Sequence, residues 1–103
     1  MVTIEPASES LKRLGERLRA ARLARNERMG LFADRIGVSI PTLRAMERGA
    51  ETIQIGFWAK ALWALDQLQH LDAVLKPSSS LLERARAQER GKPQRQRASR
   101  KRA

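Results

Sequence analysis

The chain has 103 residues, with 21 Lys and Arg against 11 Asp and Glu, no cysteine and a formal net charge of +10. This length suits one small domain with a single core, and the missing cysteines exclude disulfides and thiolate metal sites. No segment approaches the roughly 20 consecutive apolar residues that span a membrane. The first ten residues lack the basic and apolar parts of a secretory signal, so we expect a cytoplasmic protein without a membrane partner.

The positive charge is concentrated toward the C-terminus. Residues 83–103 hold nine Lys or Arg and two Glu, an excess of seven, whereas residues 1–82 hold twelve and nine, an excess of three. Such a charge favours a polyanionic partner, with nucleic acid ahead of an anionic membrane surface. The chain has one His, no glycine-rich phosphate loop, no metal-ligand spacing and no paired carboxylates. We therefore predict that it is not an enzyme and needs no metal or cofactor.

The N-terminal part is predicted to be an arm followed by an amphipathic helix. The arm covers residues 1–10, is irregular through residue 8, and offers Ser8 or Ser10 as the cap of a helix over 9–25. Leu23 falls off the apolar face of this helix and is expected to be exposed. Asn26 suits the left-handed residue that follows a helix. The apolar face itself consists of Leu11, Leu14, Leu18 and Ala21.

Two short helices separated by a tight turn come next. The first is predicted over 29–36 and ends at Gly37, although Arg28 is a weak cap for its start. Ser39 caps the second helix, over 40–48, which stops at Gly49. A steep crossing of two such helices needs small and apolar residues facing the core, and Ala33, Val38, Leu43 and Met46 meet that need. A helix-turn-helix uses this arrangement to place its second helix in the DNA major groove.

The remaining helices are predicted over 55–68 and 69–76, with Pro77 closing the second. Trp58, Leu62 and Leu65 fit core positions of the first. Phe57 and Trp63 lie about 100° or more from Trp58, in opposite senses around the helix. At least one of the two is therefore expected at a dimer or partner interface, where aromatic residues are enriched.

The C-terminal region, 77–103, is predicted to hold a linker, a short helix and a basic tail. Residues 77–80 read as the linker, and the capping box from Ser80 to Glu83 indicates a helix over 81–90. Residues 94–103 lack any apolar pattern and are expected to be disordered when free. Since no strand pattern occurs, the predicted class is all-α, with a domain over residues 11–76.

Two segments carry a resemblance to a known family. LGERLRAARLAR at 14–25 and LFADRIGVSIPTLRAMERG at 31–49 resemble the XRE, or Cro/C1-type, helix-turn-helix family, over about residues 11–76. ERGAETIQIGFWAKALWALDQLQHLDAVLKP at 47–77 is similar to HipB-like antitoxins, the DNA-binding partners of HipA-type kinase toxins. The resemblance implies a compact five-helix domain, a homodimer, binding to double-stranded operator DNA, repression of its own operon and binding of the toxin.

The resemblance also assigns roles to residues. Arg22 and Glu47 match a pair that ties the first and third helices together, and Arg48 matches a phosphate-contacting position. The family usually has a Thr or Ser cap and a Gln at the start of the second helix, where this chain has Arg28 and Met29. Either Arg28 takes over the phosphate contact, or the start of this helix is held less firmly on the DNA. The residues that match the DNA-facing side are Ser39, Ile40, Pro41, Thr42, Arg44 and Ala45, and the expected dimer or partner interface comprises Phe57, Trp63, Leu68, Leu71 and Leu75.

Pro41 fits this arrangement because the second residue of a helix has no intrahelical partner for its N–H. The DNA-facing surface is then unusually apolar. Ile40, Pro41 and Ala45 can touch thymine methyl groups, and Arg44 can grip guanine O6 and N7. Specificity is expected to depend on Arg44, apolar contacts and DNA shape.

Two other functions remain open at this point. One is an XRE-type regulator without a toxin partner. The other is a helical adaptor that binds protein or anionic lipid through its Trp and Phe surface and basic tail, with no specific DNA site.

Overall fold

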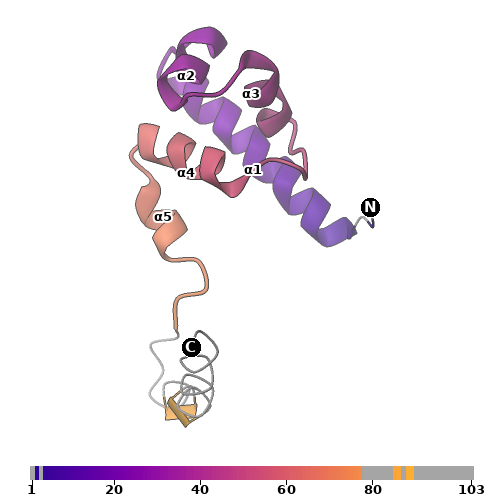
Figure 1. The fold of residues 1–103 in the computed structure, drawn as a ribbon, viewed down its shortest axis with the longest axis vertical. Coiled ribbons are helices and arrows are strands. Elements are labelled where there is room, and N and C mark those ends of the chain that lie inside the picture. The colour runs from indigo at the N-terminus through magenta and orange to yellow at the C-terminus, as the bar shows by residue number, and fades with distance from the viewer. Residues whose placement is uncertain (1, 3, 78–84, 87, 90–103) are drawn as a thin grey trace, which may run out of the picture. The chain divides into compact units, whose positions relative to one another are not determined.

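The structure is a computed structural model that describes residue 2, residues 4–77 and residues 85, 86, 88 and 89. The chain divides into two units, residues 1–71 and 72–103. The described residues contain no strand, and their helices in chain order are α1 (Glu5–Ala24), α2 (Met29–Ile36), α3 (Ile40–Glu47), α4 (Ile55–Ala64) and α5 (Leu68–Asp72) (Figure 1). The predicted all-α class is confirmed for this part of the chain.

Helix α1 begins earlier than the sequence predicted. Ile4 is its N-cap residue, Glu5 opens it, and the N–H of Ser8 already donates to the Ile4 carbonyl at 2.9 Å. The predictions of irregular residues through 8 and of a cap at Ser8 or Ser10 are therefore wrong. The physical reason is Pro6, whose fixed φ angle and missing N–H suit the first turn of a helix. Residues 5–10 of the predicted arm thus belong to α1.

The first four helices end in the same way, with a residue in the left-handed conformation. These residues are Asn26, Gly37, Gly49 and Asp66, with φ angles of 59°, 72°, 81° and 59°. After α1, for example, the N–H of Asn26 donates to the Leu23 carbonyl at 2.9 Å and that of Glu27 to the Arg22 carbonyl at 3.2 Å. This Schellman pattern satisfies the last carbonyl groups of each helix. It confirms the roles predicted for Asn26, Gly37 and Gly49.

Helix α4 is shorter than the predicted span of 55–68. The N–H of Asp66 donates to the Trp63 carbonyl at 3.0 Å and that of Gln67 to the Leu62 carbonyl at 2.8 Å, which ends the helix at Ala64. Aspartate tolerates the left-handed conformation better than most residues. Tertiary contacts also stabilise this end, because Arg25 of α1 bonds to the Asp66 carboxylate at 3.0 Å. The apolar pattern through Leu68 gave no sign of this break.

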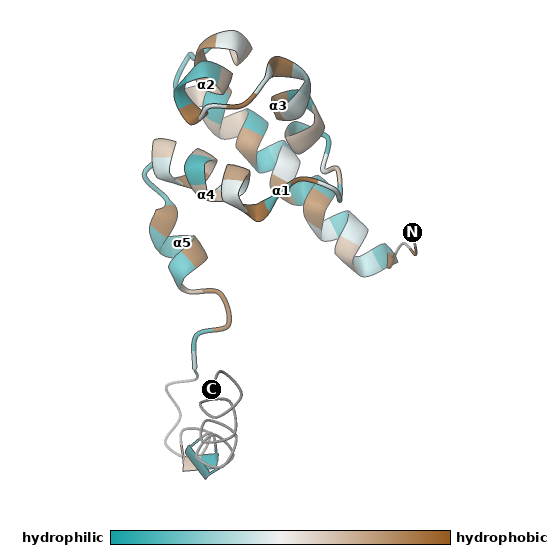
Figure 2. Cartoon of the chain, in the orientation of Figure 1, coloured by the Kyte–Doolittle hydropathy of each residue, from teal (hydrophilic) through white to brown (hydrophobic). Residues whose placement is uncertain are grey.

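The core lies where α1, α2, α3 and α4 meet. Phe32, Leu43 and Met46 are fully buried, and α3 packs against both α1 and α2, while α4 packs against α2. The predicted apolar face of α1 points inward, with Leu18 buried and Leu14 and Ala21 packed against the core. Leu23 is exposed, as predicted. Figure 2 shows polar and apolar positions alternating along α1, as expected for a helix that buries one face.

Two glycines allow α1 and α3 to cross at very short range. A Cβ atom on Gly15 would lie 2.5 Å from the Glu47 carbonyl oxygen and 2.6 Å from that of Met46. A Cβ atom on Gly49 would lie 2.6 Å from the Cα atom of Lys12. No other residue type fits these two positions without separating the backbones. The glycines therefore fix how α3 lies on α1.

Helix α5 is also shorter than the predicted span of 69–76, since it ends at Asp72. Val74 and Leu75 are exposed, and Leu75 has a φ angle of 62°. No buried contact therefore extends the helix through these residues. The predicted linker from residue 78 on, most of the predicted helix over 81–90 and the whole of 94–103 lie outside the described residues.

Candidate nucleic-acid interface

Helices α2 and α3 are joined by three residues, Gly37, Val38 and Ser39. Gly37 reverses the chain, with its N–H donating to the Asp34 carbonyl at 3.2 Å, and Val38 packs against the core. The bounds of α2 are those predicted, and α3 ends one residue before the predicted position. The tight turn between two short helices, expected from the glycine and the cap, is therefore present.

The start of α3 is held by Ser39, as predicted. Its Oγ accepts the N–H of Thr42 at 3.1 Å and donates to the Thr42 Oγ1 at 2.9 Å. Pro41 occupies the second helical position, where an N–H is not needed. A cap of this kind stabilises a helix by about 1 kcal/mol. This bond fixes the backbone of the turn that carries Ile40 and Pro41.

Helix α3 has one buried and one accessible side. Leu43, Met46 and Glu47 point into the protein. The predicted DNA-facing positions from Ile40 to Arg48 cover an arc of about 200° on the other side, given 100° per residue. Of these, Thr42 and Ala45 are half-buried, whereas Ile40, Pro41, Arg44 and Arg48 are exposed. The structure thus brings the predicted residues of α3 onto one accessible face.

The buried side of α3 is tied to α1 by an ion pair. Arg22 Nε donates to Glu47 Oε2 at 2.7 Å and its Nη2 to Oε1 at 3.2 Å, and the two side chains are only 6% and 5% exposed. The remaining Arg22 nitrogen donates to the Glu27 carbonyl at 2.8 Å. Two-point bonding of this type fixes both distance and orientation. The predicted pairing of these residues is confirmed.

Three exposed arginines lie before, within and directly after the two helices α2 and α3. Arg28 precedes α2, Arg44 lies within α3 and Arg48 follows it, and all three are exposed. None of them takes part in the ion pairs found among the described residues, which involve Arg22, Arg25 and Arg35. Their charges are therefore open to an outside anion.

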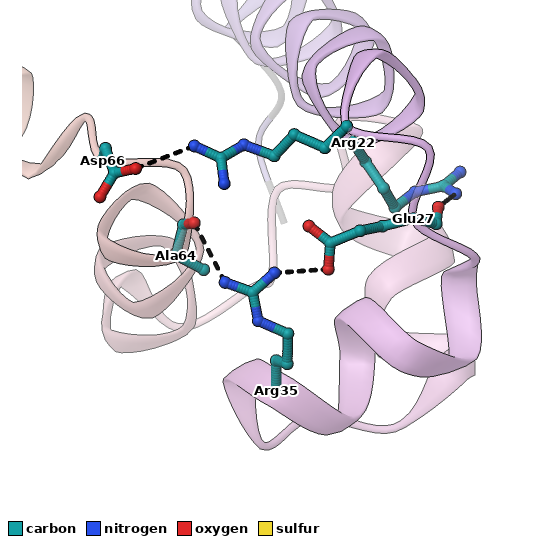
Figure 3. Close-up of polar contacts among 6 residues, drawn as sticks. Arg22, Glu27, Arg35, Ala64 and Asp66 are labelled. Carbon is teal, nitrogen blue, oxygen red and sulfur yellow. Dashed lines mark hydrogen bonds and ion pairs between the residues drawn. The ribbon is translucent and has the colours of Figure 1, made fainter.

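A second polar group links α2 to the end of α4, and the sequence gave no sign of it. Arg35 pairs with the Glu27 carboxylate and donates to the Ala64 carbonyl at 3.2 Å, as Figure 3 shows. The Arg35 guanidinium also lies 5.9 Å from the centre of the buried Phe32 ring. These partners lie 8 and 29 residues from Arg35 in the chain. No local spacing rule connects them.

The two aromatic residues of α4 whose placement the sequence left open, Phe57 and Trp63, differ in their exposure. Phe57 packs against the core and has the Lys60 ammonium 5.8 Å from its ring centre, whereas Trp63 is 62% exposed. Trp58 and Leu65 are buried, as predicted, and Leu62 is half-buried. Of the other expected interface residues, Leu68 and Leu71 are half-buried and Leu75 is exposed. Trp63 is therefore the aromatic that is open to a partner.

Two other kinds of site are absent from the part of the chain that the structure describes. There, no three His, Asp or Glu side chains gather in a way that would hold a metal ion. Among the same residues, no helix combines the length and apolar character needed to cross a membrane.

Comparison with known proteins gave no match: no family model, no curated protein and no solved structure is significantly similar to this chain.

Proposed function

We propose that the chain is a sequence-specific DNA-binding repressor that inserts α3 into the major groove. The observation that carries the proposal is the two-sided character of α3. Its inner side is locked by Gly15, Gly49 and the Arg22–Glu47 pair, and its outer side presents Arg44 and an apolar first turn. A rigid helix with an exposed arginine is what direct reading of base edges requires.

The finer assignment is a Cro/C1-type domain that works as a homodimer. Two copies of α3 would meet half-sites about one helical turn, or 34 Å, apart. Arg48 and Arg28 would bind phosphates, and Arg44 would bind guanine. The exposed Trp63 on α4 supports a dimer through the α4 and α5 region, because exposed aromatic residues are typical of such contacts.

The biological role that we propose is that of a bacterial, cytoplasmic antitoxin that represses its own operon and binds a HipA-type kinase toxin. This part of the proposal rests on the resemblance of residues 47–77. An adjacent gene for a kinase-like protein, whose product copurifies with this chain, would support it. Without such a partner, a regulator that has no toxin is the better description.

The first experiment measures binding to the DNA upstream of the protein's own gene against a scrambled duplex, over a range of salt concentrations. Arg44→Ala is expected to reduce the preference for upstream DNA by about 10- to 100-fold for each half-site, because one good guanine contact discriminates by roughly 1–3 kcal/mol. Its salt dependence should match that of the wild type. Arg48→Ala should instead weaken binding to both duplexes and lower the salt slope by about one for each bound subunit.

Arg19→Ala is the matched control, because it removes the same charge from an exposed position on α1. It should leave the preference for upstream DNA unchanged. Equal binding of all duplexes with one steep salt dependence would contradict the proposal, since charge alone would then explain binding. The adaptor function, for which the exposed Trp63 is the supporting observation, would then be the better description.

A further inference from the structure

The opening turn of α3 offers few polar groups to a partner. The Ser39 hydroxyl is engaged twice by Thr42, as acceptor from its N–H and donor to its Oγ1. Pro41 has no N–H, and Ile40 is aliphatic. Within residues 39–42, the Thr42 hydroxyl is therefore the one side-chain donor that is left. Recognition by this turn must depend mainly on apolar contact.

Ile40 provides that contact from a fixed position. It is 40% exposed, and its Cδ1 lies 3.6 Å from where a Cβ atom of Gly30 would be, which is ordinary contact distance. One end of the side chain therefore rests beside α2, and the side chain is still partly open to solvent. A β-branched side chain is also restricted at χ1. Ile40 thus offers an apolar contact surface whose position is restricted by α2 and by its own branched side chain.

The surrounding charge indicates what this surface meets. Arg44 is exposed one turn further along the same face, and Arg28 and Arg48 are exposed at the adjoining helix ends. These cations favour a polyanion, while Ile40 and Pro41 favour an apolar group on it. In the DNA major groove, the apolar substituent on a base edge is the C5-methyl group of a pyrimidine.

We propose that the opening turn of α3 recognises the C5-methyl group of a pyrimidine, with Ile40 as the contacting residue. Thymine and 5-methylcytosine share this group in the major groove, whereas uracil and unmodified cytosine lack it. Cytosine methylation within the bound site therefore raises affinity. The inference rests on the proposed function, because it names the base chemistry that the same face of α3 reads.

The test compares synthetic duplexes that differ by one methyl group. Footprinting on the upstream fragment first identifies the protected bases. Each protected thymine is then replaced by uracil, and each of these positions is also made as a C·G or a 5-methyl-C·G pair. At one position per half-site, losing the thymine methyl should weaken binding about fourfold, as expected for one buried methyl group. Methylating cytosine at that position should strengthen binding by a similar factor.

The protein variants assign the effect to a residue. Ile40→Ala should abolish both methyl effects, so that thymine equals uracil and 5-methylcytosine equals cytosine. Leu23→Ala is the control, because it removes an aliphatic side chain that is 49% exposed on α1. It should keep both effects. The wild-type comparisons need no variant, so the test stands even where Ile40→Ala is less stable.

The outcomes separate the two proposals. If the wild type prefers the upstream fragment but binds uracil and thymine equally at every protected position, methyl recognition is wrong and DNA reading stands. If the wild type has no preference for the upstream fragment, the proposed function fails and this inference fails with it. If the methyl effects persist in Ile40→Ala, a different residue makes the contact and the assignment to Ile40 is overturned.

Discussion

Arg22 shows what a single residue contributes to this protein. It lies in the core and donates hydrogen bonds to both carboxylate oxygens of Glu47 and to the Glu27 carbonyl. Burying a charge is costly unless a partner of opposite charge and further hydrogen bonds compensate it. Both conditions hold here, and no buried side-chain nitrogen or oxygen in the described residues lacks a partner. The pair thus makes the α1–α3 contact specific as well as stable.

Removal of one member of this pair should lower the free energy of unfolding far more than removal of a surface ion pair. Glu47→Ala leaves the Arg22 guanidinium buried without its carboxylate and is expected to lower the free energy of unfolding by about 3–5 kcal/mol. Denaturant unfolding followed by far-ultraviolet circular dichroism measures this.

Asp66→Asn is the control for that prediction, because asparagine also tolerates the left-handed conformation at this position. It breaks a pair between Arg25 and Asp66 whose side chains are 38% and 85% exposed. Such surface pairs typically contribute less than about 1 kcal/mol. If Glu47→Ala and Asp66→Asn lost the same stability, the pair of Arg22 and Glu47 would not be buried as described.

At the scale of elements, the ends of the helices and their close crossings determine where α3 lies. Each of the first four helices stops at a left-handed residue, which sets the direction of the next segment. Gly15 and Gly49 then allow α1 and α3 backbones to touch. Both positions need glycine because a Cβ atom would have no room there, and position 49 also needs it because its φ angle is 81°.

Substitutions of glycine by alanine should have opposite effects at two helical positions. Gly15→Ala places a methyl group 2.5 Å from the Glu47 carbonyl oxygen, so α1 and α3 must move apart and the protein should lose about 2 kcal/mol or more of stability. Gly56→Ala, in α4, meets nothing within 4 Å. It should stabilise by about 0.5–1 kcal/mol, because alanine favours helix. Thermal unfolding of both variants measures this, and a stable Gly15→Ala would contradict the close crossing.

At the scale of the whole molecule, charge and an exposed aromatic residue set the expected partners. The net charge of +10 favours DNA, and Trp63 at 62% exposure favours a second protein surface. Arg25 and Arg35 fix the end of α4 next to Trp63 by bonding to Asp66 and Ala64. This fixed geometry suits a surface that must dock repeatedly in one way.

If the chain forms the proposed homodimer, Trp63→Ser should shift it toward monomer. Removal of a central tryptophan from an interface commonly costs about 2 kcal/mol or more, or roughly a 30-fold weaker dimer. Sedimentation equilibrium over a concentration series measures the change. Ile55→Ser is the control, because Ile55 is 72% exposed at the opposite end of α4. Equal dimer constants for Trp63→Ser and the wild type would place the interface elsewhere.

Much of the fold was predictable because its signals are local. Gly37, Ser39 and Gly49 mark the ends of α2 and α3 within a residue, since caps and left-handed positions depend on a few neighbouring residues. The inward face of α1 followed from helical periodicity. The start of α1 was missed although Pro6 was a local signal for it.

Sequence patterns were enough to predict the all-α class, the cap and the two-sided pattern of α3, because these depend on periodicity and on contacts across three or four residues. Only the tertiary structure showed that Trp63 and not Phe57 is exposed, that Arg35 joins α2 to α4, and that Arg25 stabilises the end of α4 through Asp66. These features depend on partners as far as 41 residues apart, such as Arg25 and Asp66. Only the packed chain brings such groups within bonding distance, so no pattern in the sequence specifies them.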